Sequence, residues 1–336
     1  MKESAASQSK RDPALDAAKG LLILTVVFAH CFTEGALHDF IFSFHMPAFF
    51  MIAGITASLS RDADRPLGQT LWRLIRSLAI PYLFFELLGV LQELIRNGFS
   101  QSWKGFLFNS LTLRCNNIVD WFLGTLLLAK LLSLLLRLPL RRLLKRKAAQ
   151  ISYLALSLGA MGFALLLTRT EPFVFTVVRR VLVAHGFLAI GLVLEPSLRK
   201  SCLPGGFVAL AGAFGLSLLN TGFADINELH FGNPGIFLAA ALLGSWGAIQ
   251  MGKLLPREPL LWLGKNSLII MGTHIPILLL ARYAFGTTAP GVWQRVGDFA
   301  LILLLELPTV LFINRFLPFL AGKRYPRRKS DIHSTS

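Results

Sequence analysis

The chain is built from long apolar blocks, each about 20 residues long, that alternate with short polar connections. A helix of that length, rising about 1.5 Å per residue, spans the roughly 30 Å hydrocarbon core of a bilayer. Ten blocks can be distinguished, beginning near Ala14, Phe40, Ser77, Ile118, Ala149, Val178, Leu203, Asn233, Leu260 and Val296. The pattern predicts an all-α integral membrane protein, a bundle of about ten transmembrane helices over residues 14–320.

Composition and charge support this reading. Of the 336 residues, 54% are hydrophobic and only 15% are charged, whereas the surface of a water-soluble protein of this size needs more charge. The net charge of +16 is concentrated in alternate connections: FTEGALHD has no Lys or Arg, whereas RLPLRRLLKRK is strongly basic. This alternation predicts a multi-pass protein of the plasma (inner) membrane with cytoplasmic tails at residues 1–13 and 321–336. The basic charge then contacts lipid headgroups, and no nucleic-acid partner is expected.

The first apolar block carries titratable residues. Lys19 and His30 are eleven residues apart, close to three helical turns, so they share one face, and Glu34 falls near that face one turn later. A bland alternative makes Lys19 an interfacial residue and His30 a packing residue bonded to a carbonyl. Because a titratable side chain within a span is costly, a functional role is favoured for His30. For Lys19, which lies near the interface, its position favours neither the functional nor the interfacial role.

The second block contains the stretch FSFHMPAFFMIAG, with His45 and Pro47. Proline removes a backbone donor, so a kink is expected there. We expect a local unwinding that widens a pocket beside His30. The alternative is a packing kink that leaves His45 at the outer interface.

Other polar residues add candidates for binding. Arg73 and Arg76 lie one turn apart just before the third block, an arrangement that suits a phosphate, although ordinary positive-inside decoration also explains it. The ninth block places Asn266 and His274 in LGKNSLIIMGTHIP. The seven histidines are scattered without an HxxxH or HExxH spacing, so no metal site is expected.

Several of these stretches together resemble the membrane acyltransferase 3 family, in particular its fucose 4-O-acetylase-like branch. The resemblance is carried by DAAKGLLILTVVFAH followed by FSFHMPAFFMIAG, by the arginine pair of WRLIRSLAIPY, and by WFLGTLLLAKLL, LHFGNPGIFLAAALLG and LGKNSLIIMGTHIPI. Two departures stand out: Lys19 occupies a position where the family commonly has Arg, and AGITA replaces a Ser-Gly found in many relatives.

The resemblance implies transfer of an acetyl group from acetyl-CoA, a donor and not a resident cofactor, to a sugar hydroxyl of a cell-envelope or exported glycan. His30 is then the general base, and Glu34 orients it or senses the sugar. Lys19, Arg73 and Arg76 would hold the phosphates of the donor from the cytoplasmic side. His45 and Asn266 are candidates for contacts with the acceptor or the oxyanion.

Alternatives stay open at this stage. Another acyl group such as succinyl could replace acetyl, and an acetyl-histidine intermediate could replace direct transfer. A transporter of a sugar or a lipid-linked sugar would also need polar residues at mid-depth. A non-catalytic membrane scaffold is the third possibility.

Overall fold

The computed structural model describes residues 12–60, 65–97, 103–115, 117, 119–167, 173–200, 202–255, 257–285 and 291–322. Within these residues the chain is helical and forms no sheet. The helices are α1 Pro13–Cys31, α2 Ala36–Leu59, α3 Leu67–Leu74, η2 Ile75–Ala79, α4 Ile80–Asn97, α5 Trp103–Thr112, α6 Trp121–Leu143, α7 Arg146–Leu166, α8 Phe173–Val193, α9 Glu195–Leu198, α10 Leu203–Leu219, α11 Pro234–Leu254, α12 Glu258–Ala284, α13 Val292–Phe316 and η3 Pro318–Ala321. Nearly all of the two predicted tails lies outside the described residues.

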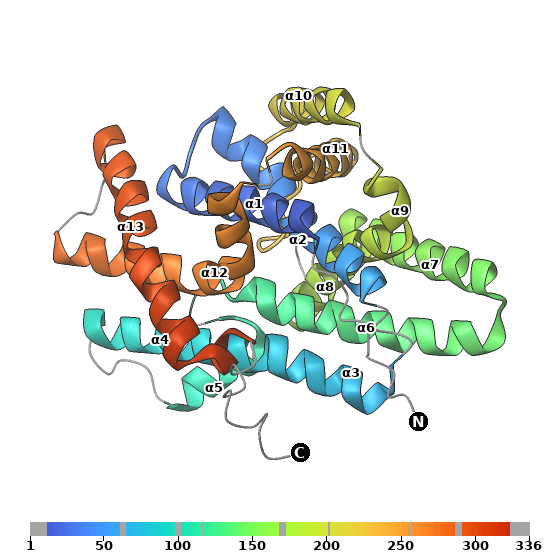
Figure 1. The fold of residues 1–336 in the computed structure, drawn as a ribbon, viewed down its shortest axis with the longest axis horizontal. Helices are drawn as coiled ribbons and strands as arrows, with labels where there is room; N and C mark the ends of the chain where they lie inside the picture. The colour runs from blue at the N-terminus through green and yellow to red at the C-terminus, as the bar shows by residue number, and fades with distance from the viewer. Residues whose placement is uncertain are drawn as a thin grey trace, which may run out of the picture.

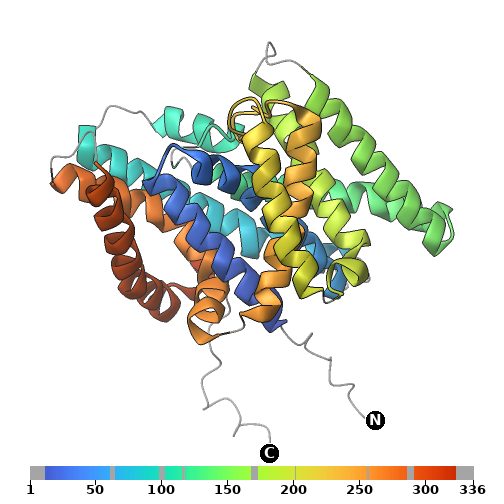
Figure 2. The same ribbon diagram turned by 90° about the horizontal axis from the view of Figure 1, so that it is seen from above.

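The described part of the chain confirms an all-α, multi-span membrane protein. It contains nine helices, or continuous helical runs, that are long and apolar enough to cross a membrane, and the remaining predicted block, the one beginning near Leu203, is the shorter apolar helix α10 of 17 residues. The start of α1 and the end of α13 lie toward the same side of the bundle (Figure 2). This side is called the terminal side here, and the opposite end of the bundle, where α1 finishes and α2 begins, is called the distal end.

The third span begins earlier than the hydropathy pattern predicts. Its helix starts at Leu67, and the π-helical segment η2 joins α3 to α4 within one run. Arg73 and Arg76 thus belong to the helix and do not precede it, and the regular α-helical turn expected between them is replaced by the onset of η2 at Ile75. Two arginines among apolar residues lowered the local hydropathy and concealed these turns.

Helix α1 occupies a central position and packs mainly against α12, α11 and α2 (Figure 1). The approach of α1 to α12 depends on glycine. A Cβ atom at Gly20 would collide with the carbonyl oxygen of Leu260, and one at Gly264 would collide with the carbonyl oxygen of Asp16. Small residues at such crossings let backbones approach closely, as is typical of membrane helix pairs. Both helices lead away from the side where α1 starts (Figure 2), and near their distal parts the ring centres of His30 and His274 lie 5.2 Å apart.

Two local expectations are wrong. Helix α2 continues without interruption through Pro47, so the unwinding predicted at FHMP does not occur. Helix α1 ends at Cys31, so Glu34 does not continue the face of His30. Gly35, which follows Glu34 with φ +102°, instead begins the turn into α2.

Candidate active site

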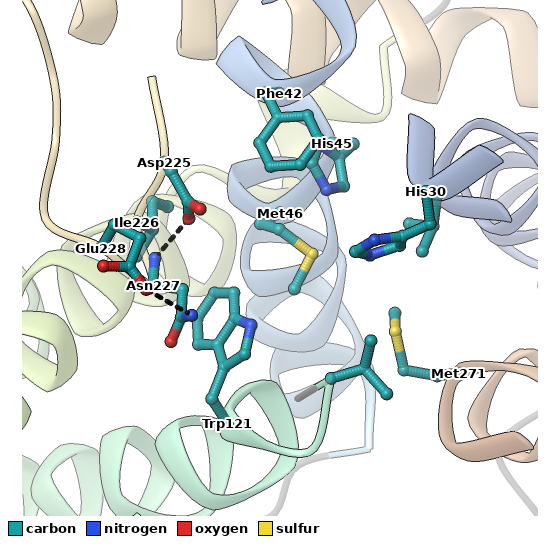
Figure 3. Close-up of a pocket in the computed structure, with 12 residues that line it drawn as sticks. His30, Phe42, His45, Met46, Trp121, Asp225, Ile226, Asn227, Glu228 and Met271 are labelled. Carbon is teal, nitrogen blue, oxygen red and sulfur yellow. Dashed lines mark hydrogen bonds between the residues drawn. The ribbon is translucent and has the colours of Figure 1, made fainter. Parts of the chain in front are cut away.

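A pocket of about 220 Å³ opens at the distal end of the bundle. It lies between the end of α1, α2, the start of α6, α12 and the loop that joins α10 to α11. Its walls are Val26, His30, Phe42, His45, Met46, Val119, Trp121, Asp225, Ile226, Asn227, Glu228 and Met271. Figure 3 shows His30, His45 and Met46 around one space, with the loop residues on its opposite side. Apolar walls with a few polar groups are typical of a small-molecule site.

His30 reaches this pocket from α1. In the described part of the chain neither of its ring nitrogens has a hydrogen-bond partner, which contradicts the alternative that His30 is a packing residue bonded to a carbonyl. Its ring lies edge-on to Phe42, with 6.3 Å between ring centres, and its centre is 5.2 Å from that of His274. A half-buried imidazole that forms no hydrogen bond and lines a cavity is available to take a proton.

His45 and His274 occur in the same local arrangement on different helices. Each lies two residues before a proline inside its helix, and each has Nδ1 close to the carbonyl four residues earlier, at 2.7 Å from Ile41 and 2.8 Å from Ile270. A carbonyl oxygen only accepts, so Nδ1 carries the proton in both rings and Nε2 has a free lone pair. His45 lines the pocket, whereas Nε2 of His274 is buried beside it without a partner.

The loop between α10 and α11 covers the distal side of the pocket with polar groups. Two backbone hydrogen bonds of 2.7 and 3.0 Å join Asp225 to His230, and the Asp225 carboxylate accepts from the backbone N–H of Asn227 at 2.7 Å. Arg180 of α8 donates to the carbonyl of Asn227 at 3.0 Å and also lies over the ring of Trp121. Burial raises the pKa of Asp225, and its backbone hydrogen bonds oppose that shift. These contacts hold the loop in place.

Sequence reasoning missed Asp225, Asn227 and Glu228 as pocket residues. They belong to the connection TGFADINELHFG, of which only the last four residues, LHFG, entered the sequence analysis, as the start of a stretch that carries the family resemblance. No spacing rule relates this connection to His30, about 200 residues earlier in the chain. Only the packing of α11 against α1 and α2 brings the loop to the pocket.

Two predicted site residues lie elsewhere. Glu34 is 76% exposed and pairs at 2.8 Å with Arg295 at the start of α13, so the expected contact with His30 is not present. Asn266 accepts a hydrogen bond of 2.8 Å from Asn314 of α13 and donates to the carbonyl of Trp262. Asn266 is two helical turns from His274, toward the terminal side, and does not line the pocket. Their proposed catalytic and binding roles receive no support from this geometry.

The residues predicted to bind the phosphates of acetyl-CoA lie on the terminal side of the bundle. Lys19 forms an ion pair of 2.6 Å with Asp16, Arg73 is exposed on α3, and Arg76 is partly buried in η2. Their roles as phosphate ligands stay a prediction. Ile23 and Val27, on the face of α1 between Lys19 and His30, are fully buried, so packed side chains separate the donor residues from the pocket.

In the described residues, no group of three or more His, Cys, Asp or Glu side chains could hold a metal ion. The side chains that line the pocket include imidazoles, carboxylates, an amide and an indole, a set suited to proton transfer and to binding a polar acceptor.

Comparisons with known proteins agree with this description. A sequence model of the family described as "Acyltransferase domain" matches residues 12–315, which include α1 to α12, all of α13 except its last residue, and every residue of the pocket. A search of curated proteins and a search of solved structures returned no match. The match covers nearly the whole chain, and the chain belongs to the acyltransferase 3 family of membrane proteins.

Proposed function

We propose that this membrane acyltransferase transfers an acetyl group from acetyl-CoA to a sugar hydroxyl and that His30 is the general base. The observation that carries the proposal is the position of His30: it lines the distal pocket, and neither ring nitrogen is bonded to the described part of the protein. A hydroxyl is a weak nucleophile and needs a base within hydrogen-bond reach, a role that histidine fills most often.

The proposed reaction is a direct transfer. The acceptor hydroxyl gives its proton to one nitrogen of His30 as its oxygen forms a bond to the thioester carbonyl carbon. The C–S bond then breaks, and the CoA thiolate takes the proton from the imidazolium. His30 is neutral again at the end, and the products are the acetyl ester and free CoA.

The acceptor is proposed to bind under the α10–α11 loop. Trp121 offers a flat apolar surface to a sugar ring, while Asn227 and Glu228 offer a donor and acceptors to its hydroxyl groups. His45 supplies a further acceptor, since its Nδ1 proton is engaged by Ile41. A mainly hydroxylic acceptor fits this lining better than a lipid chain, because a lipid chain would exclude water from these polar groups and offer them no hydrogen bonds.

The donor is proposed to approach from the terminal side, where Lys19, Arg73 and Arg76 provide positive charge for its phosphates. The helical rise from Lys19 to His30 is about 16 Å, a span suited to the extended arm of CoA. Because Ile23 and Val27 fill that face of α1, the arm has to displace them or pass beside them. Donor binding is therefore expected to change the packing of α1.

The test uses the full chain in lipid nanodiscs with [¹⁴C]acetyl-CoA and a panel of free and lipid-linked sugars. The proposal expects labelled acetyl ester that requires an acceptor and releases one CoA thiol per ester. Sugar uptake into proteoliposomes without any use of acetyl-CoA would favour a transporter. Labelling with succinyl-CoA but not acetyl-CoA would correct the acyl group and leave the role of His30 standing.

A further inference from the structure

His274 has a buried, unpartnered nitrogen beside His30. The side chain is fully buried, and within the described chain Nε2 has no hydrogen-bond partner. A buried polar atom without a partner costs about 1–3 kcal/mol, so such atoms commonly mark a functional constraint. The hydroxyl of the neighbouring residue Thr273, by contrast, has a partner, because it donates to the Glu306 carboxylate of α13. Nε2 of His274 has no such structural explanation.

We infer that His274 is a positioning residue for His30, and that its Nε2 accepts a hydrogen bond from one nitrogen of His30 in the reactive complex. This inference rests on the proposed function. No proton moves to His274. The hydrogen bond fixes which nitrogen of His30 carries a proton and leaves the other nitrogen facing the acceptor hydroxyl.

The distance between the two rings permits this contact. Each nitrogen of an imidazole is about 1 Å from the ring centre, so a centre-to-centre distance of 5.2 Å allows two facing nitrogens to approach to about 3 Å. The rings are tilted by 45° and are not hydrogen-bonded in this structure. Rotation of the unbonded His30 ring is expected to close the contact, since nothing in the described chain holds its nitrogens.

The acceptor role of His274 is fixed by its own helix. Nδ1 donates to the carbonyl of Ile270 at 2.8 Å, which leaves Nε2 only a lone pair. The helix is held there by a second contact, from Asn117 to the Gly272 carbonyl at 2.9 Å. His274 does not line the pocket, so it acts through His30 and not on the substrate. In His45 Nδ1 is likewise bonded to a carbonyl of its own helix, but His45 lines the pocket, so its proposed role is contact with the acceptor and not positioning of His30.

The test compares two side chains of similar length at position 274. His274→Gln keeps an acceptor near the place of Nε2, whereas His274→Met has no comparable acceptor. We expect Met to lower kcat by about 10- to 100-fold with little change in the acceptor KM, the scale typical of partners that orient metal-bound imidazoles. Gln should restore most of that loss. Equal kcat values for the two variants would overturn the inference.

A matched control is available at His185. Its ring is also buried, with Nδ1 donating to Ala129 and Nε2 near Ser157, but it lies outside the pocket. His185→Gln and His185→Met should have kcat values equal to each other. A kcat ratio between these two variants as large as the ratio at 274 would overturn the inference, because any buried imidazole would then give it.

Two further measurements separate the possible failures. If His30→Gln kept wild-type kcat, the proposed function itself would fail; wild-type kcat in His274→Met beside an inactive His30→Gln would overturn this inference alone. If the position 274 variants do not fold, ¹⁵N-histidine NMR of the wild type with CoA provides the answer. A nitrogen–nitrogen coupling between the two rings is expected, and its absence in the CoA-bound protein would contradict the contact.

Discussion

Asn117 donates a hydrogen bond of 2.9 Å to the carbonyl of Gly272, the carbonyl that Pro276 leaves without its helical donor. A side chain from the connection before α6 therefore replaces the missing N–H of α12. The contact lies one turn from Pro276 and two residues from His274. Proline is tolerated in membrane helices where neighbouring groups satisfy the freed carbonyl in this way.

This relationship predicts a thermodynamic coupling between Asn117 and Pro276. Asn117→Ala should lower the free energy of unfolding by about 1 kcal/mol, because the Gly272 carbonyl is left buried and unpaired. In a Pro276→Ala background the helix regains its own N–H, so the same substitution should cost less. The measurement is a double-mutant cycle of SDS-induced unfolding in mixed micelles. Additive effects of the two substitutions would contradict the conclusion that the Asn117 side chain takes the place of the N–H that Pro276 lacks.

The close crossing of α1 and α12 predicts a strong effect of Gly264→Ala. The added Cβ would collide with the Asp16 carbonyl, so the helices must separate, at a cost of about 1–3 kcal/mol. Transfer activity should fall as well, since the crossing sets the distance between His30 and His274. Gly162→Ala in α7 is the control: its Cβ would meet nothing within 4 Å, and its unfolding midpoint should equal or exceed that of the wild type. Equal midpoints for both variants would contradict this packing.

A substitution of Glu34 distinguishes the catalytic role suggested by the sequence from the exposed ion pair seen in the structure. An exposed ion pair with Arg295 is worth about 0–1 kcal/mol. Glu34→Gln should therefore change the unfolding free energy slightly and leave kcat near the wild-type value. A loss of kcat by about 100-fold, as expected for a group acting in catalysis, would restore the role that the sequence suggested.

The acceptor site predicts a change in KM at Glu228. Removal of a charged hydrogen-bond partner by Glu228→Ala should raise the acceptor KM by about 10-fold and leave kcat unchanged, because the contact holds the substrate before and during reaction. The KM for acetyl-CoA should not change. Glu34→Gln, which removes an acidic charge at the same end of the bundle, controls for general electrostatics. An unchanged acceptor KM in Glu228→Ala would place the acceptor elsewhere.

The sequence predicts the helices well because each span follows from its own apolar residues. The ten blocks, the place of His30 near the distal end, and the closeness of the FHMP segment to it are all properties of one or two neighbouring segments. Glu34 was misplaced because helical periodicity carries no information about where α1 ends. Gly35, with φ +102°, directly precedes α2 and marks the start of that helix, four residues after the last residue of α1.

The rest of the site depends on contacts between distant segments. His274 and the loop residues Asp225, Asn227 and Glu228 reach His30 only through the packing of α11 and α12 on α1. Hydropathy predicts that these helices exist but not which of them are neighbours. The start of the third span was misjudged for a different reason, since Arg73 and Arg76 lowered its local hydropathy.

The most direct test of the account is the transfer rate of His30→Gln, measured with saturating acetyl-CoA and acceptor. His38→Gln is the matched control: His38 is a second histidine at the distal end, it is buried and bonded to Asp39 at 2.9 Å, and it does not line the pocket. If His30 is the general base, His30→Gln loses at least about 100-fold in kcat, the lower end of the range for removal of such a group, while His38→Gln stays near the wild type. Wild-type kcat in a correctly inserted His30→Gln protein would contradict that role.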